Sequence, residues 1–294
     1  MTPQDQPKTK PGSAQKTLGL IAGAGRLPSE AARLLGELGY SVRVIGFEGL
    51  SEASIAEQVT EARFLRLGQL EAMAAAMNEM GVKRLLLVGK VPKSLLFDGH
   101  GIAEPDAEAV RVLSEEQERG DEPLMRAIAG WLAGRGFELC DQSEILSSFL
   151  APNGSLSARA PNRAELEDFE VGRSVVEQLG RSGVGQCVVV KQGSVLAVEA
   201  IEGTDATIRR AGELGGPGAT VIKAARPEQD RRFDLPAIGR ATIDAMGESG
   251  ASALAIEAGS TLIVDLEELI LAADRADIAV WGFEVEKSNL RRSS

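Results

Sequence analysis

Apolar residues in the first half of the chain follow two alternating spacings. Short continuous apolar runs are typical of buried strands, and an apolar residue every three or four positions is typical of a helix. The two kinds of segment alternate, which favours a doubly wound parallel sheet with helices on its faces. The predicted strands are Leu18–Ala22, Val42–Phe47, Phe64–Leu67, Leu85–Val88 and Phe137–Leu139, and the predicted helices are Leu27–Leu38, Leu70–Met80, Ala107–Arg119 and Pro123–Arg135.

The second half follows a different pattern. Turn-forming residues dominate 151–161, so we place the boundary between a first domain, 17–150, and a second α/β domain, 151–285, at this point. Two apolar runs, Gln186–Val190 and Val195–Glu199, flank a tight turn and predict a hairpin, which makes the second sheet mixed. Further strands are predicted at Val221–Ala224, Ala253–Ile256, Leu262–Val264 and Ile278–Trp281, and helices at Arg163–Leu179, Thr204–Leu214, Pro236–Met246 and Leu266–Ala273. Asn162 with Glu165 three residues later resembles a capping box at the start of the first of these helices.

Composition narrows the possible functions. The chain carries 43 acidic and 32 basic residues, a net charge of −11, which argues against a nucleic-acid partner. His100 is the single histidine, and this excludes multi-histidine metal sites. The polar ends, 1–16 and 286–294, are expected to be a disordered extension and a tail. No apolar run resembles a secretory signal or a membrane span, so a cytoplasmic location is expected.

The first predicted strand runs into a glycine turn, Gly23-x-Gly25-x-x-Pro28. Such a turn before a helix exposes backbone N–H groups to a phosphate. The dinucleotide fingerprint has a third glycine where Pro28 stands, and Glu48 is the candidate ribose-binding acid. Contact with a nucleotide or a sugar nucleotide is one interpretation, and a tight turn that needs small residues is the other.

Charged residues gather around two strands of the second half. Glu199, Glu202 and Asp205 surround a helix start, where Thr204 can cap the helix and Asp205 can complement its dipole. Asp230 is harder to explain structurally, because it lies in a segment with Arg226, Arg231 and Arg232 and without helical pattern. Carboxylates bind hard divalent cations and arginines bind phosphate oxygens, so the pattern favours chemistry on a phosphate ester or anhydride.

Several motifs together resemble one family. They are Gly23-Ala24-Gly25-Arg26-Leu27-Pro28, Glu199-x-x-Glu202-Gly203-Thr204-Asp205, Lys223-x-x-x-Pro227-x-Gln229-Asp230-x-Arg232-x-Asp234-x-Pro236 and Ala258-Gly259-x-Thr261-Leu262. They resemble the LpxI-type UDP-2,3-diacylglucosamine pyrophosphatases of lipid A biosynthesis. The resemblance implies a Rossmann-like N-terminal domain and a homodimer. It also implies an Mg²⁺-dependent hydrolysis of UDP-2,3-diacylglucosamine to UMP and 2,3-diacylglucosamine 1-phosphate (lipid X), in which water attacks the β-phosphorus. It also implies that Asp230 is the essential aspartate and that contact with the inner membrane comes through the lipid substrate.

These considerations give a set of expected site residues. The expected catalytic residues are Asp230, Arg232 and Lys223; the metal ligands Asp230, Glu202 and Asp205; and the substrate-binding residues Gly23, Gly25, Pro28, Gly203, Thr204, Asp205, Arg231, Gly259 and Thr261. Two other functions fit part of the same pattern. One is an NAD-dependent oxidoreductase that uses Gly23, Gly25 and Glu48, and the other is a non-catalytic module that binds a sugar nucleotide.

Overall fold

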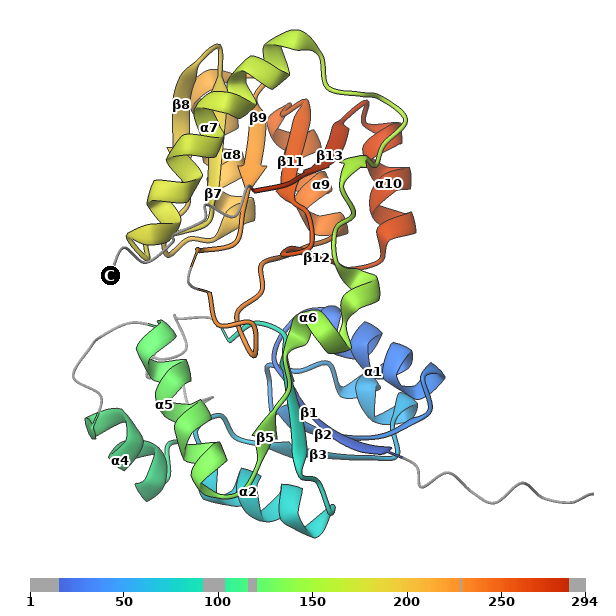
Figure 1. Cartoon of the computed structure of the whole chain (residues 1–294), viewed down its shortest axis with the longest axis vertical. Helices are drawn as coiled ribbons and strands as arrows, with labels where there is room; N and C mark the ends of the chain where they lie inside the picture. The colour runs from blue at the N-terminus through green and yellow to red at the C-terminus, as the bar shows by residue number, and fades with distance from the viewer. Residues whose placement is uncertain (1–15, 92–103, 116–120, 228, 286–294) are drawn as a thin grey trace, which may run out of the picture. The chain divides into compact units, whose positions relative to one another are not determined.

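The computed structural model describes residues 16–91, 104–115, 121–227 and 229–285. It divides into two compact units, one up to Leu139 and one from Cys140 onward, and each is described separately (Figure 1). The predicted domain boundary at 150 and 151 falls within the second unit. The predicted disordered ends lie outside the described residues except for Lys16, which begins the first strand.

The first unit is a parallel α/β sheet. It comprises strands β1 (Lys16–Ala22), β2 (Tyr40–Phe47), β3 (Glu61–Leu65), β4 (Arg84–Val88) and β5 (Glu138–Leu139), helices α1 (Leu27–Glu37), α2 (Leu70–Glu79), α4 (Ala107–Glu115) and α5 (Asp121–Gly134), and the 3₁₀ helix η1 (Ala53–Gln58). The strand order is β3-β2-β1-β4-β5, with every pair parallel. The chain therefore changes direction across the sheet between β1 and β4, where such folds bind ligands at the carboxyl ends of the strands. The predicted doubly wound sheet is confirmed.

The second unit is built on a mixed sheet. Its helices are α6 (Gln142–Ile145), α7 (Arg163–Arg181), α8 (Thr204–Gly215), α9 (Arg240–Ser249) and α10 (Leu266–Arg275), with η2 (Ser147–Phe149), and its strands are β6 (Gly154–Ser155), β7 (Cys187–Lys191), β8 (Ser194–Val198), β9 (Thr220–Lys223), β10 (Ala237–Ile238), β11 (Ala253–Glu257), β12 (Leu262–Ile263) and β13 (Ala279–Phe283). The main sheet has the order β6-β13-β11-β9-β7-β8. Its centre, β13-β11-β9, is parallel, and the predicted hairpin β7-β8 continues it in antiparallel fashion.

Helices lie on both faces of this sheet (Figure 1), and an apolar layer fills the space between the helices and each face. Phe169 and Val176 of α7 pack on one face, against Ile222 and Trp281. The other face is covered by α8, α9 and α10, whose buried residues include Ile208, Ile243 and Leu269. The start of α7 has the predicted capping box: the Asn162 side chain accepts from the Glu165 N–H, and the Glu165 carboxylate accepts from the Asn162 N–H.

Three sequence-based expectations are corrected. The helix predicted from Pro236 begins only at Arg240, because Ala237 and Ile238 form β10 and pair with β12. The strand predicted at Phe64–Leu67 is displaced to Glu61–Leu65, in register with β2. Thr204 does not cap α8, since Gly203 occupies that position and no side chain caps the helix. Among the helices that the structure describes, none is long and apolar enough to cross a membrane.

Candidate functional site

The charged residues of the second unit gather where β9 and β11 end. These strands are parallel neighbours, with Ile256 in register with Lys223, so Lys223 and Glu257 stand at the same edge of the sheet. The long connection that follows β9 carries Asp230, Arg231 and Arg232. Because ligands of α/β sheets bind at the carboxyl ends of the strands, this edge is the candidate site.

Asp230 and Arg232 form a close ion pair in this connection. Arg232 Nε lies 2.9 Å from Asp230 Oδ1 and Nη2 lies 2.6 Å from Oδ2, and the Arg232 N–H also donates to Oδ1 at 3.0 Å. The Asp230 hydrogen bond raises the pKa of Arg232, which keeps the guanidinium charged. The Arg232 side chain is 43% exposed and that of Asp230 is 20% exposed, so solvent reaches the pair.

Short contacts from α6 hold the same connection. The Gln142 N–H donates to the Arg231 carbonyl at 2.9 Å, and Gln142 Oε1 accepts from the Leu235 N–H at 3.1 Å. The exposed Arg231 guanidinium reaches Ser143 Oγ at 3.4 Å. Helix α6 has four residues and was not predicted, because one turn carries no readable periodicity. These contacts fix the backbone on both sides of Arg232.

Lys223 is buried and bound within the unit. Its Nζ donates to Thr204 Oγ1 at 2.6 Å, and Thr204 Oγ1 donates to Glu199 Oε1 at 2.8 Å. Only 3% of Lys223 is exposed, and Glu199 and Thr204 are also buried. The structure therefore brings two predicted residues, Lys223 and Thr204, together in a network that fixes the start of α8. Neighbouring Cys187 is fully buried, and burial raises the pKa of its thiol, which fits the role of a small apolar residue.

The other two predicted metal ligands already have partners. Glu202 accepts from Arg210 Nη2 at 2.6 Å, and Asp205 accepts from Thr242 Oγ1 at 3.1 Å. Within the described ranges, no group of three or more His, Cys, Asp or Glu side chains is arranged to hold a metal ion. Mg²⁺ does not require three protein carboxylates, because the ion is commonly held by one or two carboxylates together with substrate phosphates and water. The partly exposed Asp230 meets that requirement.

Glu257 is a site residue that the sequence-based reasoning missed. It ends β11, and its Oε2 accepts from the Ala225 N–H at 2.9 Å, just after β9. Burial raises the pKa of Glu257, while a hydrogen bond from Ser260, the Ala225 N–H and the charge of Arg231 lower it in part. One acidic residue at a strand end gives no local signal, so only its place beside β9 reveals it.

Two predicted substrate-binding residues follow Glu257 along the chain. Gly259 is exposed, has φ +67°, and its N–H donates to the Ala151 carbonyl at 2.9 Å. Thr261 is fully buried, and its hydroxyl finds no hydrogen-bond partner in the part of the chain that the structure describes. The turn around Gly259 is therefore open to a ligand, whereas the Thr261 side chain points into the interior. Gly203, with φ +81°, supplies the left-handed turn before α8.

The glycine turn of the first unit is packed against β4. The Gly23 N–H donates to the Val88 carbonyl and the Ala24 N–H to the Lys90 carbonyl, both at 2.7 Å. A Cβ on Gly23 would lie 2.7 Å from the Lys90 oxygen, so this position requires glycine for a close backbone approach. Pro28 is buried, while Gly25 is exposed with φ +91° and open space around it. Of the three predicted contacts, Gly25 is the one placed to meet a ligand.

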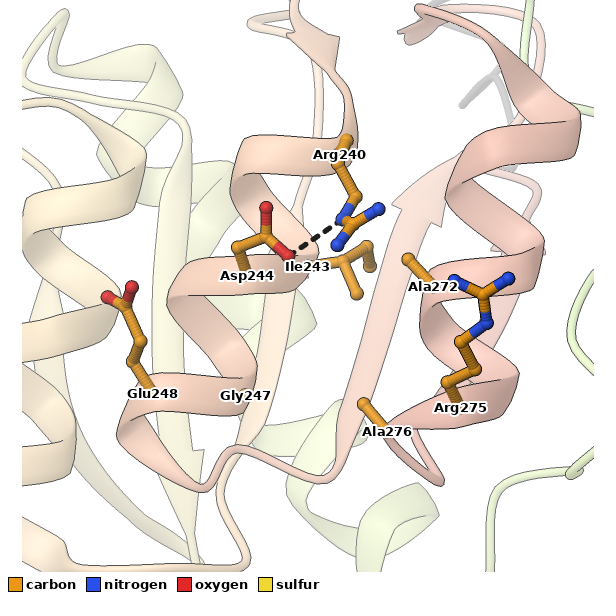
Figure 2. Close-up of a pocket in the computed structure, with 8 residues that line it drawn as sticks. All are labelled: Arg240, Ile243, Asp244, Gly247, Glu248, Ala272, Arg275 and Ala276. Atoms are coloured by element: carbon orange, nitrogen blue, oxygen red, sulfur yellow. Dashed lines mark hydrogen bonds and ion pairs between the residues drawn. The ribbon is translucent and has the colours of Figure 1, made fainter.

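An open surface pocket lies elsewhere on the second unit. It has a volume of about 410 Å³ and lies between α9 and α10 (Figure 2). Three of its charged residues are already paired: Arg240 Nε lies 2.7 Å from Asp244, and Glu248 lies 2.7 Å from Arg209. The lining residues are Arg240, Ile243, Asp244, Gly247, Glu248, Ala272, Arg275 and Ala276. None of the predicted site residues lines it.

Comparison with known proteins gives matches over both units. A family model described as the LpxI N-terminal domain matches residues 17–149, and one described as the LpxI C-terminal domain matches residues 152–281. The UDP-2,3-diacylglucosamine pyrophosphatase LpxI of Caulobacter vibrioides (strain ATCC 19089 / CIP 103742 / CB 15) is 31% identical over 285 residues, 92% of this chain and 99% of that protein.

Solved structures give weaker similarities. The UDP-glucose-4-epimerase of Stenotrophomonas maltophila, with bound NAD and formylated UDP-arabinopyranose, is 13% identical over 90% of this chain and 98% of that chain, with a TM-score of 0.31. The enzyme WbmG of Bordetella bronchiseptica, in complex with NAD and UDP, is 12% identical over 93% and 98% of the two chains, with a TM-score of 0.31. These scores are too low to establish a shared fold.

Proposed function

Because the chain belongs to the LpxI family, we propose that it hydrolyses the pyrophosphate bond of UDP-2,3-diacylglucosamine in lipid A biosynthesis. The proposed products are UMP and 2,3-diacylglucosamine 1-phosphate, lipid X. The observation that carries this proposal is the match over nearly the whole of a relative that is named for this activity. The charged residues at the ends of β9 and β11 support it, because they suit a pyrophosphate substrate.

The proposed chemistry is attack of water on the β-phosphorus. The bond from this phosphorus to the bridging oxygen breaks, so UMP leaves with the bridging oxygen and the water oxygen stays on lipid X. Arg231 and Arg232 would offset the negative charge that develops on the phosphoryl oxygens. Glu202 and Asp205, at the start of α8, would orient the water, accept its proton or provide a second metal ligand.

We further propose that the reaction depends on Mg²⁺, with Asp230 as its first protein ligand. A bound Mg²⁺ neutralises phosphate charge and aligns the attacked phosphorus. Asp230 fits because its carboxylate is partly exposed and lies in a connection that α6 holds in place. Arg232 engages both Asp230 oxygens, so its partly exposed guanidinium would have to shift toward the phosphates when Asp230 binds the ion.

The direct test is turnover of UDP-2,3-diacylglucosamine by the purified protein with Mg²⁺. We expect UMP and lipid X, and in ¹⁸O-labelled water we expect the label in lipid X. Asp230→Asn preserves the shape of the side chain and removes its charge, so kcat should fall by at least about 100-fold. Glu213→Gln, on the exposed face of α8, is the matched control. No turnover by the wild-type protein, or full activity of Asp230→Asn, would contradict the proposal.

The NAD-dependent alternative is less well supported by the first unit. Two of the backbone N–H groups that would face a pyrophosphate, those of Gly23 and Ala24, are bound to the carbonyls of Val88, which ends β4, and Lys90, which follows it. Glu48, the candidate ribose ligand, lies 3.8 Å from Arg66. A fluorescence titration with NADH separates this alternative from hydrolysis. A non-catalytic sugar-nucleotide module would instead bind UDP-sugars tightly without turning over any of them.

We also propose that the protein is a cytoplasmic homodimer that contacts the inner membrane through its lipid substrate. Sedimentation equilibrium measures the oligomeric state. Flotation with lipid vesicles, with and without UDP-2,3-diacylglucosamine, measures the contact with the membrane. Binding that requires the lipid substrate supports the proposal, and equal binding without it contradicts it.

A further inference from the structure

We infer that Glu257 is a positioning residue for the proposed reaction, and that it acts by fixing the start of the connection that carries Asp230. The inference rests on the proposed function for its kinetic consequences. Its structural consequence, which is how firmly residues 225–226 and 229–230 are held, does not depend on the proposed function. The two can therefore be tested separately.

Glu257 ends a central, buried strand of the second unit. Strand β11 lies between β9 and β13 and is parallel to both, and Ala253–Ile256 are fully buried. The backbone position of Glu257, at the end of this strand, is therefore well fixed. The connection after β9 has no regular secondary structure over residues 224–226 or 229–236, so its geometry depends on single contacts such as the one from Glu257.

A short series of hydrogen bonds leads from Glu257 to Asp230. Glu257 Oε2 accepts from the Ala225 N–H at 2.9 Å. The next residue, Arg226, donates its N–H to Gln229 Oε1 at 2.8 Å, and its carbonyl accepts from the Gln229 N–H at 3.1 Å. The Asp230 carbonyl then accepts from the N–H groups of Phe233 and Asp234. Loss of the first contact would loosen the part of the connection before Asp230, because α6 still holds the part after it.

The contact with the Ala225 N–H needs an acceptor oxygen and not a charge. Burial raises the pKa of Glu257, so its charge costs stability, and the charge of Arg231 offsets this cost only in part. Glu257 therefore acts on the connection through the hydrogen bond from the Ala225 N–H.

The experiment compares Glu257→Ala with Glu257→Gln, in full-length protein. The alanine variant loses the acceptor for the Ala225 N–H, so kcat should fall on the order of 10- to 100-fold with a smaller change in KM. Glutamine keeps an acceptor oxygen and should restore kcat to within about 3-fold of the wild type. Glu213→Gln again controls for the loss of one negative charge at an exposed site.

Hydrogen exchange gives a readout that is independent of activity. Glu257→Ala should exchange faster at residues 225–226 and 229–230 while β9 and β11 keep their protection, and Glu257→Gln should exchange as the wild type does. Wild-type kcat in Glu257→Ala, or equal losses in both variants, would overturn the inference and leave the proposed function standing. An inactive wild-type protein would contradict the proposed function, and the exchange pattern would still decide the role of Glu257.

Discussion

Asp230 and Arg232 are two residues apart, and this spacing lets the arginine bind the aspartate through both its backbone and its side chain. Three donors of one residue, the N–H, Nε and Nη2 of Arg232, reach the two oxygens of Asp230. Such a fork fixes the plane of the carboxylate as well as its position. The charge of Arg232 is permanent, so the pair presents both signs of charge on an exposed connection. Under the proposed function, Asp230 would hold the metal ion and Arg232 would meet the phosphates.

Arg232→Lys tests whether this geometry matters beyond the charge. Lysine keeps the positive charge but cannot bind two oxygens, of Asp230 or of a phosphate, with a planar fork, so kcat should fall by about 10-fold or more. The unfolding midpoint should change little, because an exposed ion pair contributes only about 0–1 kcal/mol. Steady-state kinetics and thermal unfolding check the two expectations. A lysine variant with wild-type kcat would show that charge alone is needed.

The elements show which features could be predicted from the sequence. The capping box at Asn162 and the hairpin turn at Gln192–Gly193 were predicted from local residues, because their signals are local. Strands β6 and β10 have two residues each and carry no period, so they were not found. The site position of Glu257 was not predicted for a different reason. It depends on the pairing of β11 with β9, which is a long-range property that local sequence does not encode.

Gly23→Ala tests the close contact between the segments that follow β1 and β4. The added Cβ would lie 2.7 Å from the Lys90 carbonyl oxygen, so backbone must move at a cost of about 1–3 kcal/mol. Gly36→Ala is the matched control, because open space surrounds that glycine near the end of α1 and alanine favours a helix by up to about 1 kcal/mol. Chemical denaturation of both variants measures the difference. Equal stability of the two would refute the packing role of Gly23.

At the scale of the whole molecule, acidic residues outnumber basic ones, and each unit keeps at least one carboxylate charged through specific partners. In the first unit, hydrogen bonds from Arg111 and Trp131 lower the pKa of Glu108 to about 2. In the second unit, burial acts to raise the pKa of Glu165, but hydrogen bonds from Arg159 and Ser252 outweigh it and the pKa is lowered. These contacts join α4 to α5 and the start of α7 to the segment before β11.

The lowered pKa values predict how stability depends on pH. A carboxyl group whose pKa is lower in the folded state stabilises the fold above its unfolded pKa, here 4.5, and this contribution is lost as the pH falls toward the folded value. The free energy of unfolding should therefore decrease steadily below pH 4.5, as measured by urea denaturation at a series of pH values. Glu108→Gln and Glu165→Gln should each start from a lower stability at neutral pH and show a shallower decrease, because glutamine does not titrate. If both variants keep the wild-type slope, other carboxylates among the 43 acidic residues must carry the acid response.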